Sequence, residues 1–165
     1  GHMLLSKCNF IRVGKFNESL PSGEDFDFCY RAKMLGIKIN SDPSLKVCHL
    51  GYPDNILDFA RREIWHGQGD CINLSTLLQS PVSLVSLLVL GLHLPLLVFL
   101  FINLNVVYLL LAIILFIILY VNYYKFSYDN IANFTKRSCI MYIYLLSRGL
   151  ALPFRLFKRK ALLSF

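Results

Sequence analysis

Hydrophobic positions dominate the second half of the chain, and their spacing predicts membrane helices. No charged side chain occurs from Cys71 through Tyr124. Residues 81–102 are apolar apart from two serines and His93, which is about the 20 residues that a helix needs to cross a bilayer. A short polar turn at 103–105 precedes a second apolar run. The pattern therefore predicts two transmembrane helices, at about 81–102 and 106–124, within a membrane segment at 71–125.

The last segment, 126–165, is apolar but interrupted. Arg148, Pro153 and Arg155 break its apolar run, and a basic tail follows at 158–160. A helix with charge on one face and apolar side chains on the other is typical of the membrane interface. The pattern favours an amphipathic interfacial helix over a third transmembrane span.

Residues 1–70 show shorter patterns, in which helix signals alternate with strand signals. Ser22 is a plausible helix N-cap and Gly36 a plausible stop, and a second helix is expected from about Asn55 to His66, with Gly67 as its stop. Short strands are expected at the start of 4–13, at 37–39 and at 45–49. We therefore predict an α/β class: short strands and helices in 1–70, followed by the helical hairpin and the interfacial helix.

Charge is distributed unevenly along the chain, whose formal net charge is +7. Lys and Arg balance Asp and Glu through Asp70, nine against nine, and from Cys71 onward eight basic residues face one acid, Asp129. A basic surplus beside apolar segments marks the cytoplasmic side of a membrane, whereas a nucleic-acid partner needs a basic face on a soluble domain. The turn at 103–105 has no Lys or Arg. We expect a multi-pass plasma-membrane protein with its polar part in the cytoplasm, and no nucleic-acid partner.

Two further classes are disfavoured by composition. The five cysteines are scattered without a C-x-x-C pair, which argues against a zinc knuckle or a disulfide framework and fits a reducing compartment. The predicted spans contain no Asp, Glu, Lys or Arg that would mark an ion pathway. A transporter or channel is therefore a weak interpretation.

Three carboxylates crowd one predicted helix start, at Glu24, Asp25 and Asp27. One interpretation is a capping box, in which Ser22 caps the helix, Asp25 returns to the backbone and the acids complement the helix dipole. The other is a general base, since the aromatic residues at 26, 28 and 30 would place a carboxylate against a partly desolvated wall. The two interpretations are compatible, because a helix start fixes a carboxylate in place.

Two other groups of residues carry candidate chemistry. His49 closes an apolar run, where a lone histidine is more often structural than a metal ligand. Arg61 and Arg62 lie one helical turn from Trp65. Such a group serves either cation–π packing on a solvated helix face or capture of a phosphate by the planar guanidinium groups.

Three ordered blocks of residues 1–70 resemble a known enzyme family. They are residues 9–18 (NFIRVGKFNE), 22–31 (SGEDFDFCYR) and 42–51 (DPSLKVCHLG). Together they resemble the second half of a family 2 glycosyltransferase, whose pattern is close to VGgFdE…GEDxDfcyR…DPslkVxHlG. The following residues 61–67 (RREIWHG) look like the Arg- and Trp-containing segment that many members carry before their membrane helices.

The resemblance implies a GT-A fold, a nucleotide-sugar donor and displacement with inversion at the anomeric carbon. Asp25 would be the general base and Glu24 would orient the acceptor or the base, with Asp27 contacting substrate. His49 would help to hold a divalent metal, Mg²⁺ or Mn²⁺, at the donor diphosphate. Residues Arg61, Arg62 and Trp65 would close over the donor phosphates or the acceptor.

The chain also departs from the family pattern. No Asp-x-Asp precedes Asn9, no Gly-rich phosphate loop occurs, and Lys15 and Asn17 replace the usual Gly and Asp. We therefore expect the acceptor-side part of a membrane glycosyltransferase acting on a cell-envelope glycan or a lipid-linked acceptor, inactive until another chain or segment supplies the nucleotide-binding half. The alternative is a non-catalytic membrane anchor or a truncated remnant, and membrane lipids are partners in either case.

Overall fold

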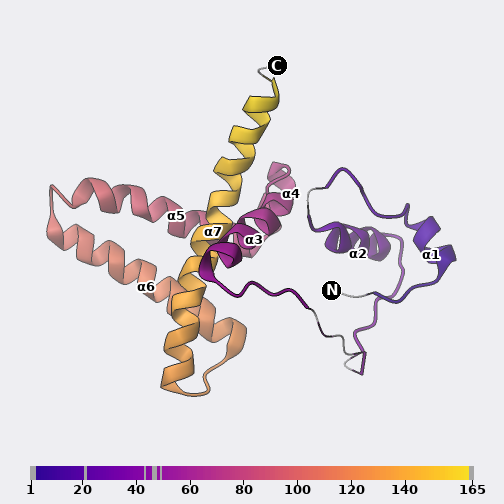
Figure 1. Cartoon of the computed structure of the whole chain (residues 1–165), viewed down its shortest axis with the longest axis horizontal. Helices are drawn as coiled ribbons and strands as arrows, with labels where there is room; N and C mark the ends of the chain where they lie inside the picture. The colour runs from indigo at the N-terminus through magenta and orange to yellow at the C-terminus, as the bar shows by residue number, and fades with distance from the viewer. Residues whose placement is uncertain (1–2, 21, 43, 46–47, 49, 164–165) are drawn as a thin grey trace.

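The computed structural model of the chain describes residues 3–20, 22–42, 44–45, 48 and 50–163, with side chains described through Phe157. Every regular element in these ranges is an α-helix, so the predicted α/β class is wrong. In chain order the helices are α1 (Lys7–Arg12), α2 (Glu24–Met34), α3 (Ile56–Asp70), α4 (Leu74–Leu78), α5 (Pro81–Phe99), α6 (Leu104–Phe126) and α7 (Ile131–Leu163), as Figure 1 shows.

The expected strands are not found in the described part of the chain, because nothing there pairs with them. Within 4–13, residues 4–6 form no strand, and the helical turn expected after them is helix α1. Ser6 is its N-cap and accepts a hydrogen bond from the Asn9 backbone N–H. Residues 37–39 alternate apolar and polar but run as unpaired chain. The expected strand at 45–49 includes residues outside the described ones. A period of two predicts a strand only where a neighbour completes its backbone hydrogen bonds.

Helix α2 begins differently from the prediction and ends as predicted. Its N-cap is Gly23, with φ of 79°, and no side chain caps it. The Ser22 hydroxyl donates to α3 instead, so the capping-box interpretation is wrong for Ser22. The helix ends at Met34, and Gly36 follows with φ of 72°, a conformation that glycine adopts at low cost. Gly36 is confirmed as the stop.

Helix α3 begins at the predicted position but runs past its expected stop at Gly67. Gly67 and Gly69 serve close packing instead of ending the helix. A Cβ at Gly67 would lie 2.6 Å from the Cβ of Ala151 on α7, and a Cβ at Gly69 would lie 2.5 Å from the Ser22 carbonyl oxygen. Glycine is therefore kept inside this helix because larger residues do not fit between it and its neighbours.

Helix α2 packs on the loop before it through a small apolar cluster. Val13, Phe28 and Ala32 are the buried side chains of this cluster. Arg31 adds hydrogen bonds to the backbone carbonyl oxygens of Val13 and Lys15 in that loop. These contacts fix the start of α2 relative to the preceding residues.

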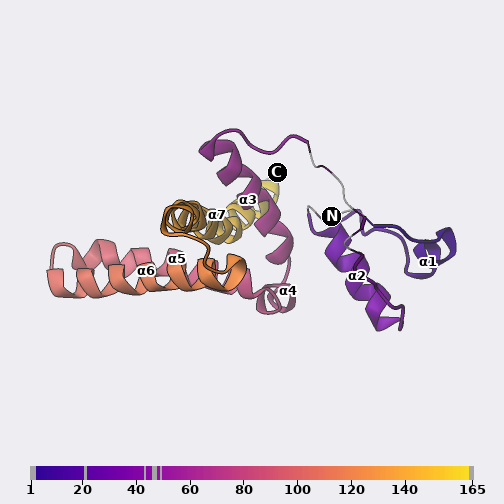
Figure 2. The same ribbon diagram turned by 90° about the horizontal axis from the view of Figure 1, so that it is seen from below.

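Helices α5 and α6 form an antiparallel hairpin, and the two helices lie side by side in both views (Figures 1 and 2). Ser80 caps α5, and the Asn103 side chain accepts two backbone N–H groups at the start of α6. Mean hydropathies of 2.4 and 2.9 make both helices apolar enough to cross a membrane. The apolar segments predicted at 81–102 and 106–124 are thus helices of spanning length.

Helix α7 crosses the hairpin instead of running along it. In Figure 1 it passes steeply across α5 and α6, and in Figure 2 it is seen almost along its axis while the hairpin lies across the view. Five buried side chains pack at the crossing: Val89, Ile114, Ile118, Met141 and Leu145. The segment Ile131–Phe157 is also long and apolar enough to cross a membrane, with a mean hydropathy of 1.3. The interfacial placement of α7 stays a prediction.

Candidate active site

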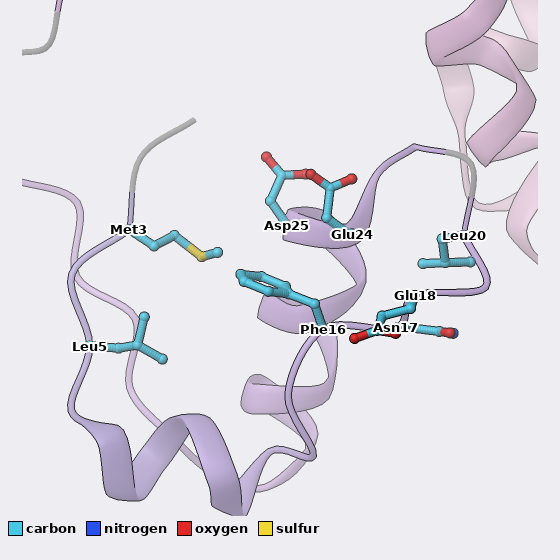
Figure 3. Close-up of a pocket in the computed structure, with 8 residues that line it drawn as sticks. All are labelled: Met3, Leu5, Phe16, Asn17, Glu18, Leu20, Glu24 and Asp25. Carbon is cyan, nitrogen blue, oxygen red and sulfur yellow. The ribbon is translucent and has the colours of Figure 1, made fainter.

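A pocket of about 560 Å³ lies at the start of α2 (Figure 3). Glu24 and Asp25, on the first turn of α2, both line it. The remaining lining residues come from the N-terminal segment and from the loop before α2: Met3, Leu5, Phe16, Asn17, Glu18 and Leu20. Both predicted catalytic residues therefore face one cavity, which combines carboxylates with an apolar wall.

The apolar wall is built from residues other than the expected ones. Phe26 and Tyr30 are exposed, and Phe28 is buried in the cluster beneath α2. Phe16 lines the pocket instead, and its ring also packs edge-on against Phe10 at a centroid distance of 5.3 Å. The expectation that the aromatic residues of α2 form the wall is wrong, because successive helical positions point in different directions around the axis.

The helix start orients the Asp25 carboxylate. Its Oδ1 accepts a hydrogen bond from the Phe26 backbone N–H at 2.8 Å. Unsatisfied N–H groups at a helix N-terminus carry partial positive charge, which attracts carboxylates. Asp25 is therefore held at the pocket by its own element, and it is half-buried there.

Asp27 lies on the same helix but takes part in a structural contact. Its Oδ2 accepts hydrogen bonds from Arg31 Nε at 2.9 Å and Nη2 at 2.8 Å, one turn along α2. Arg31 in turn binds the loop before α2, so Asp27 supports the loop that lines the pocket. Asp27 itself is not one of the lining residues. Its predicted contact with substrate stays a prediction.

The three residues predicted to bind phosphate, Arg61, Arg62 and Trp65, lie on α3 in different surroundings. Arg61 is 76 % exposed and pairs with Asp58 at 3.0 Å. Arg62 lies over the rings of Tyr52 and Phe59, at 5.1 and 5.8 Å from their centroids. Trp65 is 47 % exposed. Arg61, Arg62 and Trp65 do not line the pocket beside Asp25, so their closure over a donor stays a prediction.

The first turn of α2, with Glu24, Asp25 and Asp27, is called the acidic turn. Helix α3 meets it through Ser22. The Ser22 hydroxyl lies within hydrogen-bonding distance of the carbonyl oxygens of Trp65, at 3.3 Å, and His66, at 3.0 Å. Burial lowers the pKa of His66, and the carboxylates of Glu63 and Asp25 oppose this shift. His66 is therefore within electrostatic reach of the candidate base, a relation that the sequence alone did not indicate.

A buried ion pair between α3 and α7 was also missed by sequence reasoning. Glu63 of α3 is buried and contacts Arg148 of α7. Arg148 interrupts an apolar run, and an isolated charge in such a run signals a buried partner. That signal was available, but the partner lies 85 positions away in sequence and was not predictable from spacing.

The metal site stays a prediction, because the described residues do not include its ligand. His49, the predicted ligand, lies outside them. In the described ranges no three His, Cys, Asp or Glu side chains are arranged to hold a metal ion. Mg²⁺ and Mn²⁺ prefer several oxygen ligands, so these residues by themselves do not fit a divalent ion.

Comparison with known proteins identifies the family. A family model described as glycosyl transferase family group 2 matches residues 8–128. The match extends beyond the three blocks recognised in residues 1–70 and includes the α5–α6 hairpin. No curated protein and no solved structure matches the chain.

Proposed function

Because the chain belongs to glycosyl transferase family group 2, we propose that it is the acceptor-side part of a membrane-bound inverting glycosyltransferase. The family match includes both the acidic turn and the hairpin, and three helices are long and apolar enough to cross a membrane. The observation that carries the proposal is the pocket at the start of α2, where Glu24 and Asp25 meet an apolar wall.

In this proposal Asp25 is the general base. Its carboxylate takes the proton of an acceptor hydroxyl, whose oxygen then forms a bond to the anomeric carbon of the donor sugar. The bond from that carbon to the nucleotide diphosphate breaks, and its electron pair leaves with the diphosphate. Attack opposite the leaving group inverts the anomeric configuration.

The rest of the pocket supports this step. Glu24, the neighbouring carboxylate, orients the acceptor hydroxyl toward Asp25. Phe16 and Leu20 keep water from one side of the bound acceptor, which limits hydrolysis of the donor. Arg61, Arg62 and Trp65 bind the donor diphosphate or the acceptor from α3, since guanidinium groups match phosphate geometry. A divalent metal at the donor diphosphate would take its oxygen ligands from a donor-binding region.

The arrangement of helices supports a site at the membrane surface. Helix α7 crosses the hairpin at a steep angle (Figures 1 and 2), and we propose that the hairpin crosses the bilayer while α7 runs along its cytoplasmic side. The basic residues Lys125, Lys136 and Arg137 then lie at the cytoplasmic face. We propose a lipid-linked or cell-envelope glycan acceptor, which this surface presents to the pocket.

Transfer of labelled sugar tests the proposal. Vesicles that contain the chain and a donor-binding half of the family are given labelled nucleotide sugars and an acceptor extract. We expect label in the lipid or glycan fraction only when both parts are present, with inverted anomeric configuration in the product. Equal transfer by the donor-binding half alone would leave the chain as an anchor and contradict the proposal.

A further inference from the structure

A buried ion network joins α3 to α7 through Arg148. Arg148 Nε donates to Glu63 Oε2 at 3.0 Å, and its Nη1 donates to Asp70 Oδ2 at 3.2 Å. The side chains of Arg148, Glu63 and Asp70 are 16 %, 7 % and 33 % exposed. We call these three residues the charge clamp. One planar guanidinium reaches two carboxylates in different directions, which a lysine ammonium on a flexible stem does less well.

Neighbouring side chains extend the charge clamp to a third helix. The hydroxyls of Ser83 and Ser80, at the start of α5, donate to Asp70 Oδ2 at 2.8 and 3.2 Å. The Arg148 guanidinium also lies 5.5 Å from the ring centroid of Tyr144 on its own helix. The clamp therefore links α3, α5 and α7, and its charges are satisfied by named partners.

Close backbone packing surrounds the charge clamp. A Cβ at Gly67 of α3 would lie 2.6 Å from the Ala151 Cβ, and a Cβ at Gly149 of α7 would lie 2.6 Å from the Ser86 carbonyl oxygen of α5. Helix α7 thus touches α3 with one side and α5 with another, within four residues of Arg148. The clamp's hydrogen bonds are already 3.0 and 3.2 Å long, so a shift of α3 away from α7 would break them.

Helix α3, which the charge clamp holds against α5 and α7, is hydrogen-bonded to the residue before the acidic turn. Ser22, which precedes Gly23 and the pocket carboxylates, bonds to the carbonyl oxygens of Trp65 and His66. These carbonyls lie on the same helix as Glu63 and Asp70, between the two clamp carboxylates. A continuous set of contacts therefore runs from the membrane hairpin through α7 and α3 to the start of α2.

We propose that Arg148 is a positioning residue that sets the height of Asp25 above the bilayer. By holding α3 on α5 and α7, the charge clamp places the pocket where an acceptor embedded in the membrane reaches it. This inference rests on the proposed function of the pocket. Arg148 lies outside residues 8–128, so the family match does not include it.

The depth of Trp65 in the membrane tests the clamp without any assay of sugar transfer. Trp65 is the single tryptophan of the chain and lies on α3. In vesicles with lipids brominated at different depths, its fluorescence quenching reports how far α3 lies from the bilayer centre. We expect Arg148→Gln to shift the quenching profile toward shallow positions and to broaden it, and Arg148→Lys to produce a smaller shift.

Arg137→Gln is the matched control. Arg137 lies on the same helix and forms an ion pair with Asp129, but that pair does not involve α3. We expect its quenching profile to equal that of the wild type. An unchanged profile for Arg148→Gln, with helical content retained by circular dichroism, would overturn the proposal.

If Arg148→Gln does not fold, a variant without the three charges of the clamp replaces it in the Trp65 measurement. The triple variant Glu63→Gln, Asp70→Asn, Arg148→Gln removes the charges of all three clamp residues. Arg62, which also contacts Glu63 at 3.4 Å, keeps its position over the rings of Tyr52 and Phe59. We expect this variant to fold and to show the same shift of Trp65. A folded triple variant with the wild-type profile would show that packing alone holds α3.

Kinetics of the assembled enzyme distinguish positioning from a purely structural role. We expect Arg148→Lys to raise KM for a membrane-embedded acceptor by on the order of 10- to 100-fold, because small misplacements are costly. Transfer to a water-soluble acceptor should stay unchanged. Equal losses on both acceptors would contradict positioning, and absence of transfer by the wild type would refute the proposed function while leaving the Trp65 result intact.

Discussion

His66 shows how single residues on α3 respond to both the pocket and the clamp. Burial lowers its pKa, the carboxylates of Glu63 and Asp25 raise it, and the guanidinium groups of Arg148 and Arg62 lower it. The neutral imidazole is therefore favoured in the folded chain. Its ring lies 4.7 Å from the Trp65 ring, centroid to centroid, so protonation of His66 has an optical reporter beside it.

We predict that Trp65 fluorescence titrates with a midpoint below pH 6.5, because protonated imidazole quenches indole and the pKa of His66 is lowered from 6.5. The same shift makes folding pH-dependent. As pH falls through 6.5, His66 takes up a proton in the unfolded chain before it does so in the folded chain. The free energy of unfolding that neutral His66 contributes above pH 6.5 is therefore lost as the pH falls. A fluorescence titration checks this, with His66→Gln as the control that removes the transition. A midpoint at or above 6.5 would contradict it.

The residues of the pocket were only partly predictable from sequence. Glu24 and Asp25 were identified from the acidic turn, and the structure places both on a pocket. Phe16 and Leu20 were not, since they come from a loop whose path depends on how Arg31 binds its backbone. Spacing in the sequence predicts which residues are neighbours on one helix or strand. The wall of a pocket is formed by segments that meet only after folding, so spacing does not predict it.

Helices were predicted more successfully than strands because helical hydrogen bonds are local. The apolar runs and the Asn103 turn located the hairpin, and Gly36 located the end of α2. The short run at 37–39 had no such local support, and it forms no strand. Gly67 was misread as a helix stop, because its role depends on contact with Ala151 of α7.

The crossing of α7 and α5 provides a prediction about elements. A Cβ at Gly149 would lie 2.6 Å from the Ser86 carbonyl oxygen, whereas a Cβ at Gly91 would meet nothing within 4 Å. We expect Gly149→Ala to destabilise the helix packing by about 1–3 kcal/mol, since overpacking against backbone cannot relax easily. Gly91→Ala should leave stability unchanged or raise it by up to about 1 kcal/mol through helix propensity.

Unfolding by sodium dodecyl sulfate, followed by circular dichroism, measures both variants against the wild type. The two substitutions add the same methyl group to a helix of the membrane region, so their difference isolates the crossing contact. Equal effects of the two substitutions would show that α7 does not approach α5 as closely as described.

At the level of the whole molecule, the orientation of α7 determines which parts share a side of the membrane. If the hairpin spans the bilayer and α7 lies on its surface, the loop at 127–130 and the C-terminus are on the same side. The turn at 103–105 is then on the opposite side, and it carries no Lys or Arg.

Topology reporters check this arrangement. We expect a reporter inserted at 103–105 to be read outside the cytoplasm, and reporters at Asp129 and after Phe165 to be read inside. A C-terminal reporter outside the cytoplasm would mean that α7 spans the membrane, as the hydropathy of Ile131–Phe157 also permits. A cytoplasmic signal at 103–105 would overturn the orientation of the hairpin.

The most direct test of the central claim is the turnover of the assembled enzyme with Asp25→Asn. Loss of a general base should lower kcat by roughly 10²- to 10⁴-fold while the Kd for the nucleotide sugar stays unchanged. Asp54→Asn, the same substitution at an exposed loop position outside the family blocks, serves as the control and should retain wild-type turnover. Wild-type kcat in Asp25→Asn would contradict the account, because no proton would then pass to this carboxylate.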